Sequence, residues 1–325
     1  MIISRTPYRV SFVGGGTDLP AFYTRSPGLV VSTTVNKYIN IVVNEGFEDH
    51  MRLSYSRTEI VKHVHEIEHP LIREALNLTG LTANRLHIYS MGDVPAGTGL
   101  GSSSAFTVGL LKALWAFKGV YINARDLAEQ ACRIEIDILG EPIGKQDQYA
   151  AAFGGLRWIQ FNTDGSVETE PIVCTLETYH ALAEHLIFFY LGTTRAAGHI
   201  LREQQSRITD TYPIMCQMRD LVPEFVRILE RGTHLPELGE ILHQGWELKK
   251  QLASGISNAT IDEYYERARA AGALGGKVLG AGGTGFLMMF CEPHLRERVR
   301  TALPELRPVE MKLEREGARI VFYEP

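Results

Sequence analysis

Short β-branched segments and helical patterns alternate along the first half of the chain. Residues 9–13, 28–35 and 37–43 are rich in valine, isoleucine and threonine, which predicts an initial sheet. Further elements are expected as a helix at 68–79, a strand at 86–90, helices at 106–117 and 126–139, and a strand at 154–161. This alternation is typical of a mixed α/β fold.

The second half of the chain has a different pattern, in which most of the expected elements are helices. A strand is expected at 185–191, and periodicity then predicts four helical segments between residues 196 and 272. The chain ends with a glycine-rich stretch at 275–285, a strand at 286–290, a helix at 293–303 and a strand at 318–323. A chain of 325 residues exceeds what one core usually serves, so two domains are expected, residues 1–172 and 173–325.

A glycine-paced turn at residues 93–105 leads directly into the helix expected at 106–117. Glycines at every second position permit backbone turns with positive φ, and three serines supply hydroxyls: Gly97, Gly99, Gly101, Ser102, Ser103 and Ser104. The apolar helix that follows is expected to be buried, with its N-terminus facing the turn. Its unpaired N–H groups and partial positive charge would favour an anion, so the pattern indicates a phosphate-binding loop.

The turn is not one of the two commonest phosphate-binding motifs. Neither residues 144–146 nor residues 276–278 complete the Walker pattern, in which Gly-Lys-Ser/Thr follows an earlier glycine. The glycine spacing at 97, 99 and 101 also differs from the dinucleotide fingerprint. Taken alone, a Gly/Ser cluster of this kind is more typical of a glycine-rich linker before an ordinary helix, so the interpretation depends on the other motifs of the chain.

Composition and charge narrow the class of protein. The chain is 45% hydrophobic and 22% charged, with a net charge of -5, which is typical of a globular protein and argues against a nucleic-acid partner. The four cysteines are far apart and in apolar surroundings, as in a reducing cytoplasm. We find no signal-like apolar run and no membrane-length segment, so we expect a cytoplasmic protein without a membrane partner.

Three acids stand in patterns that invite a functional interpretation. Asp18 ends a glycine turn after the first strand, where it would otherwise simply cap a hairpin. Glu135 falls on an apolar helix surface, where a metal ion would compensate its charge; an ordinary surface acid near Arg133 is equally compatible with the spacing. Asp147 lies between two glutamines in an expected loop, where it could also be a turn former. Three histidines, His63, His65 and His69, occur in a polar stretch of their own, and we expect them on a surface helix rather than at a metal site.

Together these clusters resemble the motifs of the GHMP kinase superfamily of small-molecule kinases. Residues 95–105 match the family's phosphate-loop motif, and residues 9–18 match its first motif in the sugar-kinase form. Residues 280–285 match the third motif, with Thr284 where glycine is usual. Residues 6–18 and 141–149 look most like the branch that contains D-glycero-D-manno-heptose 7-phosphate kinase. The resemblance spans most of the chain, in the right order.

The resemblance implies a GHMP kinase fold and an ATP site. The fold would combine an N-terminal domain like domain 2 of ribosomal protein S5 with a ferredoxin-like C-terminal domain, with the active site between them. Ser103 and Glu135 would hold Mg²⁺. The ATP phosphates would be held by the loop residues Pro95, Gly97, Thr98, Gly99, Leu100, Gly101, Ser102, Ser103 and Ser104.

The same resemblance assigns the acceptor side. Asp147 matches the acid that accepts the proton of the substrate hydroxyl, and Arg9 matches the position at which the sugar kinases of the family carry an arginine beside that acid. Asp18 matches the acid that binds sugar hydroxyls, with Gly16, Thr17, Gly282 and Gly283 nearby as further substrate-binding residues. If the acceptor carries a phosphate, Lys145 and Arg195 are candidates to bind it, although most loop cations are simply solvated.

The expected activity is therefore transfer of the γ-phosphate of ATP to a sugar phosphate. The heptose branch implies the anomeric hydroxyl of D-glycero-D-manno-heptose 7-phosphate, which would give the 1,7-bisphosphate. Galactose, fucose or a uronic acid are alternative acceptors, and a nucleotide- and sugar-binding regulator without activity is the alternative of another class. The expected partner is a small molecule, and a homodimer is an open expectation.

Overall fold

The larger sheet is built on two long antiparallel strands at its centre. The computed structural model describes residues 1–82, 85–192 and 198–324. In it β1 (Ile2–Val13) pairs with β2 (Gly28–Glu45) along most of its length. The sequence predicted two strands at 28–35 and 37–43, but β2 is continuous. Asn36 does not interrupt it, because its N–H donates to the Lys312 carbonyl (2.9 Å) and its side chain accepts from the Lys312 N–H (2.7 Å).

The other strands extend this sheet on both sides of the central pair. Nine described strands take part, and the main order is β13-β1-β2-β5-β3-β4, with β3 parallel to β5. The hairpin of β6 and β7 joins the first part of β2, and β12 pairs with its middle. The bounds are β3 (Met51–Ser54), β4 (Thr58–Val61), β5 (Leu86–Gly92), β6 (Arg157–Phe161), β7 (Val167–Pro171), β12 (Leu313–Glu314) and β13 (Arg319–Tyr323).

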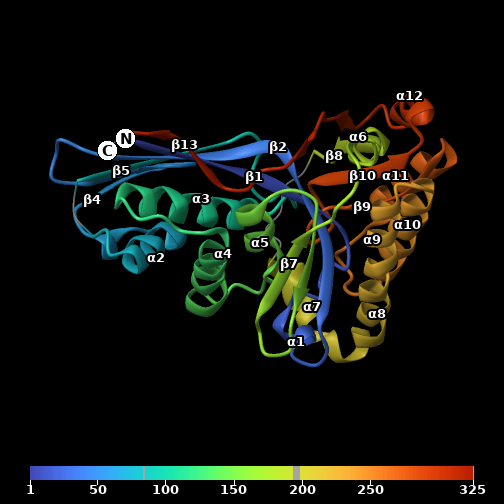
Figure 1. The fold of residues 1–325 in the computed structure, drawn as a ribbon, viewed down its shortest axis with the longest axis horizontal. Helices are drawn as coiled ribbons and strands as arrows, with labels where there is room; N and C mark the ends of the chain where they lie inside the picture. The colour runs from blue at the N-terminus through green and yellow to red at the C-terminus, as the bar shows by residue number, and fades with distance from the viewer. Residues whose placement is uncertain (83–84, 193–197, 325) are drawn as a thin grey trace.

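Helices cover one face of this sheet (Figure 1). The central one, α3 (Ser102–Phe117), is buried along most of its length, and Gly109 allows its backbone to approach Thr6. The single helix predicted at 126–139 is wrong in one respect, because α4 (Ala124–Cys132) passes into a π-helical turn, η2 (Arg133–Ile138). The remaining helices of this half are α1 (Pro20–Tyr23), η1 (Val64–Glu66), α2 (Pro70–Thr79) and α5 (Gln146–Phe153).

A second, antiparallel sheet forms the other half with its own helices. Its order is β11-β8-β10-β9, with β8 (Leu186–Tyr190), β9 (Ala273–Val278), β10 (Phe286–Cys291) and β11 (Arg307–Pro308). α6 (Leu176–His185) precedes β8, and η3 (Pro293–Leu295) follows β10 and leads into α12 (Arg296–Thr301). The two sheets with their helices give the two-domain α/β fold that the sequence led us to expect.

Five helices, rather than the four predicted, occupy the described part of residues 196–272. One boundary falls at Leu221, where Pro223 sits in the first turn of α9 and provides no N–H to continue a helix. The helices are α7 (Gly198–Ser206), α8 (Ile208–Asp220), α9 (Val222–Arg231), α10 (Pro236–Lys249) and α11 (Ala259–Ala270).

Strand pairing crosses the expected domain boundary at residue 172. β12 and β13 come from the second half of the sequence, yet they pair with β2 and β1 of the first sheet. The two ends of the described chain therefore lie side by side (Figure 1), and the Met1 amine donates to the Glu324 carbonyl at 2.6 Å. The boundary at 172 stays a prediction.

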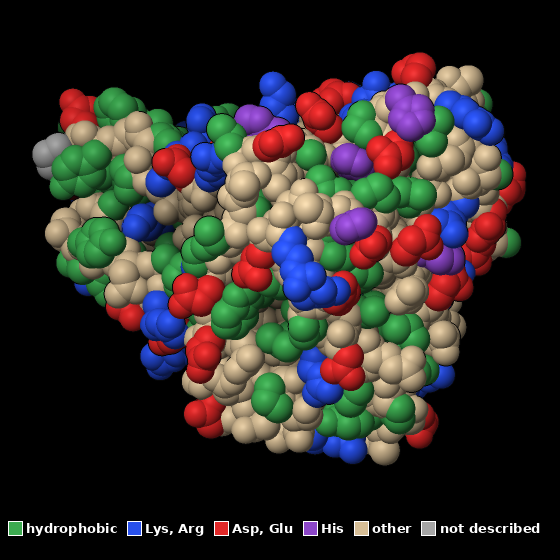
Figure 2. All heavy atoms as spheres, turned by 45° about the vertical axis from the view of Figure 1, so that its right-hand side comes forward, with side chains coloured by type: hydrophobic (Ala, Val, Ile, Leu, Met, Phe, Trp, Pro, Cys, Tyr) green, Lys and Arg blue, Asp and Glu red, His purple; other side chains and the backbone are tan. Residues whose placement is uncertain are grey.

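The surface is polar and mixed in charge. On the face drawn in Figure 2, lysine and arginine side chains are interspersed with aspartate and glutamate. Among the described helices, none combines the length and the apolar character needed to span a membrane.

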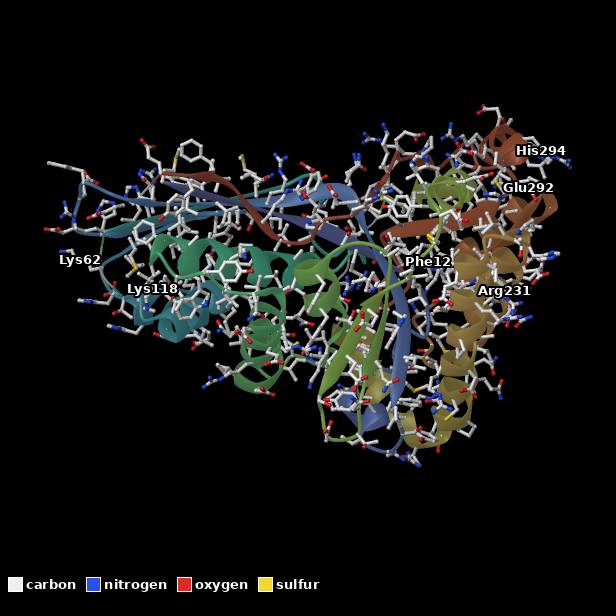
Figure 3. The ribbon with its side chains drawn as sticks, viewed as in Figure 1. Phe12, Lys62, Lys118, Arg231, Glu292 and His294 are labelled. Atoms are coloured by element: carbon white, nitrogen blue, oxygen red, sulfur yellow. The ribbon has the colours of Figure 1, made fainter. Side chains whose placement is uncertain are left out.

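One aromatic contact joins α9 to the first sheet. Phe12 of β1 points towards the helices of the second half (Figure 3), and its ring stacks on Phe225 with centroids 5.4 Å apart. Phe225 is fully buried, in the same core as the strands of the larger sheet.

We expect Phe225→Ala to lower the free energy of unfolding by about 3 to 5 kcal/mol, because it removes a buried ring and leaves a cavity. Urea denaturation measures this. Phe47 is 93% exposed, so Phe47→Ala serves as the matched control and should change stability by less than about 0.5 kcal/mol. Equal effects of the two substitutions would contradict the role of this contact.

Candidate active site

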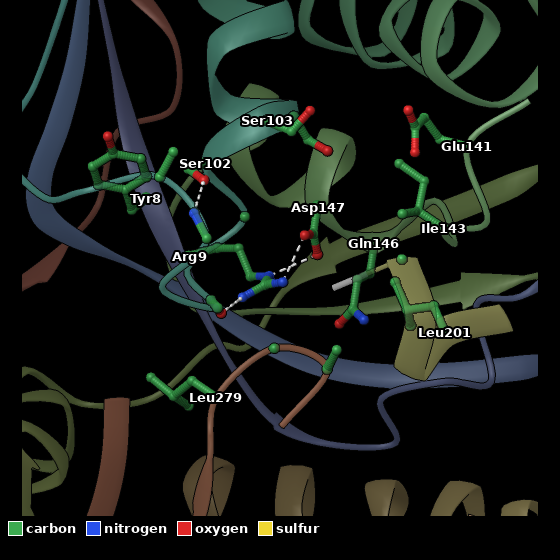
Figure 4. Close-up of a pocket in the computed structure, with 18 of the residues that line it drawn as sticks. Tyr8, Arg9, Ser102, Ser103, Glu141, Ile143, Gln146, Asp147, Leu201 and Leu279 are labelled. Carbon is green, nitrogen blue, oxygen red and sulfur yellow. Dashed lines mark hydrogen bonds and ion pairs between the residues drawn. The ribbon is translucent and has the colours of Figure 1, made fainter. Parts of the chain in front are cut away.

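A cavity of about 730 Å³ lies where the two halves of the chain meet (Figure 4). Its wall combines residues of β1, the glycine/serine loop and the start of α5 from the first half with residues of α7, α10 and the loop after β9 from the second. A cavity of this size suits a nucleotide or a small ligand pair. The site therefore depends on both halves.

The glycine/serine loop forms one wall of the cavity. Gly97, Gly99 and Gly101 all have φ between 73° and 79°, a region that residues with side chains rarely adopt. α3 begins immediately afterwards at Ser102, so the first N–H groups of a 16-residue helix face the loop. The arrangement provides the anion site that the sequence indicated.

A second glycine-rich loop packs directly against the first. A Cβ atom on Gly99 would lie 2.3 Å from the Leu279 carbonyl oxygen, and one on Gly280 would lie 2.5 Å from the Gly99 Cα. A Cβ on Gly285 would lie 2.1 Å from the Thr98 oxygen. These contacts between backbones bring the expected third motif to the edge of the phosphate loop.

Arg9 and Asp147 form an ion pair inside the cavity (Figure 4). The Arg9 Nε donates to Asp147 Oδ1 at 2.7 Å, and a terminal nitrogen donates to Oδ2 at 2.6 Å. The other terminal nitrogen donates to the Gly99 carbonyl at 2.6 Å, which ties the pair to the phosphate loop. Asp147 lies in the first turn of α5, not in a loop as the sequence suggested. A bidentate pair fixes the orientation of the carboxylate.

Asp18 is buried beside this pair. Its Oδ1 accepts from the Gly16 N–H at 3.0 Å, and its Oδ2 accepts from the Gln146 N–H at 3.2 Å. Burial and the charge of Asp147 raise the pKa of Asp18 to about 6, although these N–H groups oppose the shift. A Cβ on Gly144 would lie 1.9 Å from Oδ2, so a glycine there lets the chain close over the carboxylate.

Glu135 is fully buried behind the serines of the loop, which excludes the alternative of a surface acid. Its two carboxylate oxygens accept from Ser103 Oγ and from Gln148 Nε2, both at 2.7 Å. Burial raises the pKa of Glu135 to about 7, and these hydrogen bonds oppose the shift. The residue lies in the π-helical turn η2, and such turns are frequent at functional sites.

Most of the residues selected from the sequence contribute to the cavity wall, and some do not. The wall includes Arg9, Gly16, Asp18, Gly97, Gly99, Gly101, Ser102, Ser103, Ser104, Asp147 and Gly282. The wall does not include Pro95, Thr98, Leu100, Thr17, Glu135, Lys145 or Gly283, whose binding roles stay predictions. The Lys145 ammonium donates to the Gly165 carbonyl at 2.7 Å, outside the cavity, and Arg195 lies outside the described residues.

Several cavity residues were not identified from the sequence. The expectation that His69 lies on a surface helix is wrong: it lines the cavity, and its ring stacks on Phe106 with centroids 5.1 Å apart. Lys249 and Lys277 also line the wall. A lone lysine in the apolar stretch 273–279 was a signal that could have identified Lys277, whereas Lys249 sits at the end of an ordinary amphipathic helix.

Comparisons with known proteins agree with this geometry. Residues 70–155 match the family described as GHMP kinases N terminal domain, and residues 221–308 match GHMP kinases C terminal. The two matches together cover more than half of the chain.

Similar proteins of the same length strengthen the assignment. The chain is 28% identical to a D-glycero-alpha-D-manno-heptose 7-phosphate kinase of Campylobacter jejuni, over 93% of each protein. A crystal structure of a D-glycero-D-manno-heptose 1-phosphate kinase from Bacteroides thetaiotaomicron superposes with a TM-score of 0.82 at 25% identity, over 100% of both chains. A mevalonate kinase of Thermococcus sibiricus is 26% identical over 91% of this chain and 83% of its own. The chain belongs to the GHMP kinase family and, like the sugar kinases of that family, is a phosphotransferase with an alcohol group as acceptor.

Proposed function

We propose that this protein transfers the γ-phosphate of ATP to a sugar phosphate, most specifically to the anomeric hydroxyl of D-glycero-D-manno-heptose 7-phosphate. The observation that carries the proposal is the Arg9–Asp147 pair, held beside the N-terminus of α3 in one cavity. A carboxylate and a phosphate cradle at such close range are what transfer to a hydroxyl requires.

The reaction follows from the position of these groups. The loop and the first N–H groups of α3 hold the ATP phosphates, and Asp147 orients the acceptor hydroxyl and takes its proton as the new O–P bond forms. Arg9 donates to both carboxylate oxygens and so keeps the acid in place; its charge also offsets the negative charge that spreads over the transferred group. The leaving group is ADP.

Unpaired polar atoms mark where sugar hydroxyls would bind. Ser11 Oγ and Gln146 Oε1 are buried in the cavity wall and have no hydrogen-bond partner among the described residues. Buried polar atoms are costly unless a partner satisfies them. Together with Asp18 they offer donors and acceptors to a polyhydroxylated ligand on the side of Asp147 away from the phosphate loop.

An aromatic end of the cavity suits the adenine base. Tyr55, His69 and Phe106 line it, with the Tyr55 ring edge-on to His69 at 4.6 Å and His69 stacked on Phe106. Flat rings of this kind stack on a nucleobase. His69 Nδ1 is buried without a hydrogen-bond partner among the described residues.

Ser103 and Glu135 fit a magnesium ion. Mg²⁺ prefers oxygen ligands and is usually held by one or two carboxylates together with substrate phosphates. Glu135 is a buried carboxylate that forms no ion pair in the described residues. Among the described residues, no group of three or more His, Cys, Asp or Glu side chains could hold a metal ion by itself. We therefore expect the nucleotide to supply most of the ligands of the ion. The ion would neutralise phosphate charge.

The nature of the acceptor is supported by two similar proteins. One is named a heptose 7-phosphate kinase and the other a heptose 1-phosphate kinase, so both names point to heptose phosphates. Galactose, fucose and a uronic acid are the alternative acceptors. A panel of these sugars with both heptose phosphates, assayed for ADP release with ATP and Mg²⁺, tests the proposal; binding of ATP and sugar without ADP release would favour a regulator.

Replacing Asp147 by Asn should lower kcat by roughly 10²- to 10⁴-fold, the range for loss of a positioned general base. Asn retains the shape and can still hydrogen-bond a hydroxyl, so ATP and sugar binding should stay close to wild type by calorimetry. Asp164→Asn, in an exposed turn, is the control. Turnover of D147N within a few-fold of wild type would remove Asp147 from the role of base.

Ser103→Ala should raise the Mg²⁺ concentration needed for half-maximal rate by roughly 10- to 100-fold, because it removes one hard oxygen and the partner that positions Glu135. A magnesium titration of ADP release measures this. Ser166→Ala, in the turn between β6 and β7, is the matched control. An unchanged titration in S103A would refute the assignment.

The stability of the protein should depend on pH through Glu135. Its pKa of about 7 in the folded protein exceeds the ordinary value of a glutamate, so between these values the folded state holds a proton that the unfolded state has lost. Stability therefore falls as the pH rises through this window. Glu135→Gln lacks this term, so its stability relative to wild type should improve by about 2 to 3 kcal/mol from pH 5 to pH 8.

Urea denaturation in buffer with a chelator, to exclude Mg²⁺, gives the two free energies. The amide of Gln148 can turn to satisfy the new side chain, since its Oε1 has no partner among the described residues. The exposed acid Glu129, on the neighbouring helix, supplies the control E129Q. A stability difference between E135Q and wild type that is independent of pH would contradict the raised pKa.

A further inference from the structure

Two buried lysines lie in the part of the cavity wall that comes from the second half of the chain. Lys249 ends α10 and is 6% exposed; Lys277 lies in β9 and is 5% exposed. The Lys277 ammonium donates to the Phe12 carbonyl at 3.0 Å, and the Lys249 ammonium donates to the carbonyls of Gly280 and Val278. Both side chains line the cavity.

Neither ammonium is neutralised by an acid. In the described part of the chain, no carboxylate forms an ion pair with Lys249 or Lys277. A buried charge without a counter-ion is costly, and an ammonium has three donors, more than these carbonyls use. The pair therefore has both the charge and the spare donors to bind an anion in the cavity.

In the ligand-free protein, burial and neighbouring positive charges disfavour the protonated forms of both lysines. Burial and Arg9 lower the pKa of Lys249 to about 7, against the opposing effect of Asp18. Burial, Lys249 and Arg9 lower the pKa of Lys277 well below its ordinary value. Bringing a dianion next to the two lysines would reverse these shifts, because an opposite charge favours the protonated form.

We propose that Lys249 and Lys277 bind the phosphate group that the acceptor sugar already carries. The inference rests on the proposed function and names the residues that would select a phosphorylated acceptor. The β1 backbone meets the phosphate loop at Arg9, whose N–H donates to the Leu100 carbonyl, whereas Lys277 contacts β1 at Phe12. Phe12 lies three positions after Arg9, about 10 Å along the strand, so Lys277 lies on the Ser11 side of the cavity. Lys249 is close enough to Asp18 for that carboxylate to raise its pKa, and its ammonium is held at the Gly280 carbonyl, beside the phosphate loop.

The cavity therefore has two groups of anion-binding donors. The loop and α3 hold the nucleotide phosphates, and the lysines enter the cavity from the second half of the chain, Lys249 from the end of α10 and Lys277 from β9. A sugar with its reacting hydroxyl at Asp147 can then extend its phosphorylated end towards the lysines. An acceptor without that phosphate leaves both ammonium groups uncompensated.

The kinetic test compares phosphorylated and unphosphorylated heptose as acceptors. Lys249→Met and Lys277→Met keep an unbranched side chain one atom shorter and remove the charge. Each should lower kcat/KM for the heptose phosphate roughly 10- to 100-fold, mainly through KM. Activity on unphosphorylated heptose should change less than about threefold. Equal losses on both acceptors, carried by kcat, would assign the lysines to the transferred group and overturn the inference while leaving the kinase activity intact.

Lys112→Met is the matched control. Lys112 is also partly buried, its pKa is lowered by burial, and its ammonium donates to a backbone carbonyl, that of Ile122 at 2.9 Å, but it does not line the cavity. K112M should leave both acceptors unaffected. If wild-type protein phosphorylates no sugar at all, the proposed function fails. Whether the two lysines bind a phosphate group is then tested by a binding measurement alone.

That binding measurement uses inorganic phosphate on wild-type protein saturated with Mg²⁺ and a non-hydrolysable ATP analogue. At pH 8 the phosphate is largely dianionic, so protonation of the lysines should appear as proton uptake when calorimetry is repeated in buffers of different ionisation enthalpy. Affinity should fall as the pH rises from 7 to 9. Phosphate binding without proton uptake, or binding retained in both K249M and K277M, would overturn the site.

Discussion

The site depends on contact between two glycine-rich backbones. The loop at residues 97–101 and the loop at residues 280–285 come from different halves of the chain, and each fits against the other because no side chain intervenes at Gly99, Gly280 and Gly285. One strand of the first half, β1, leads into the same junction and delivers Arg9 to the Gly99 carbonyl. Without this approach the cavity would have no second wall, and the buried lysines would have no ligand space to face.

Burial shifts the pKa values of the charged groups that surround the cavity. Glu135 and Asp18 are acids whose pKa values are raised because water is excluded, and Lys249 is a base whose pKa is lowered for the same reason. Each group is held by hydrogen bonds but lacks a full counter-charge in the protein. Such a site is electrostatically incomplete until an ion, a nucleotide and an acceptor enter, so ligand binding and charge compensation are the same event.

The sequence predicted the parts of the site that depend on local pattern. Glycine spacing indicated the phosphate loop, and the resemblance selected Arg9, Asp18 and Asp147, which the structure brings together. Local pattern could not show that Asp147 starts a helix, or that a π-helical turn buries Glu135, because both depend on packing between distant segments. Lys249 and His69 were missed for the same reason: their chain neighbours are ordinary, and long-range contacts alone place them in the wall.

The pairing of β13 with β1 bears on how the chain acquires its structure during synthesis. The ribosome produces β1 first, and its partner at residues 319–323 emerges only after both halves have been made. Until then one edge of β1 has unpaired backbone groups that can recruit other strands. The late strand thus makes completion of the first sheet a distant, slow contact. The exposed edge of β1 in growing chains should therefore need protection against pairing with other chains. A chaperone could cover the edge, or a low concentration of growing chains could make such encounters rare.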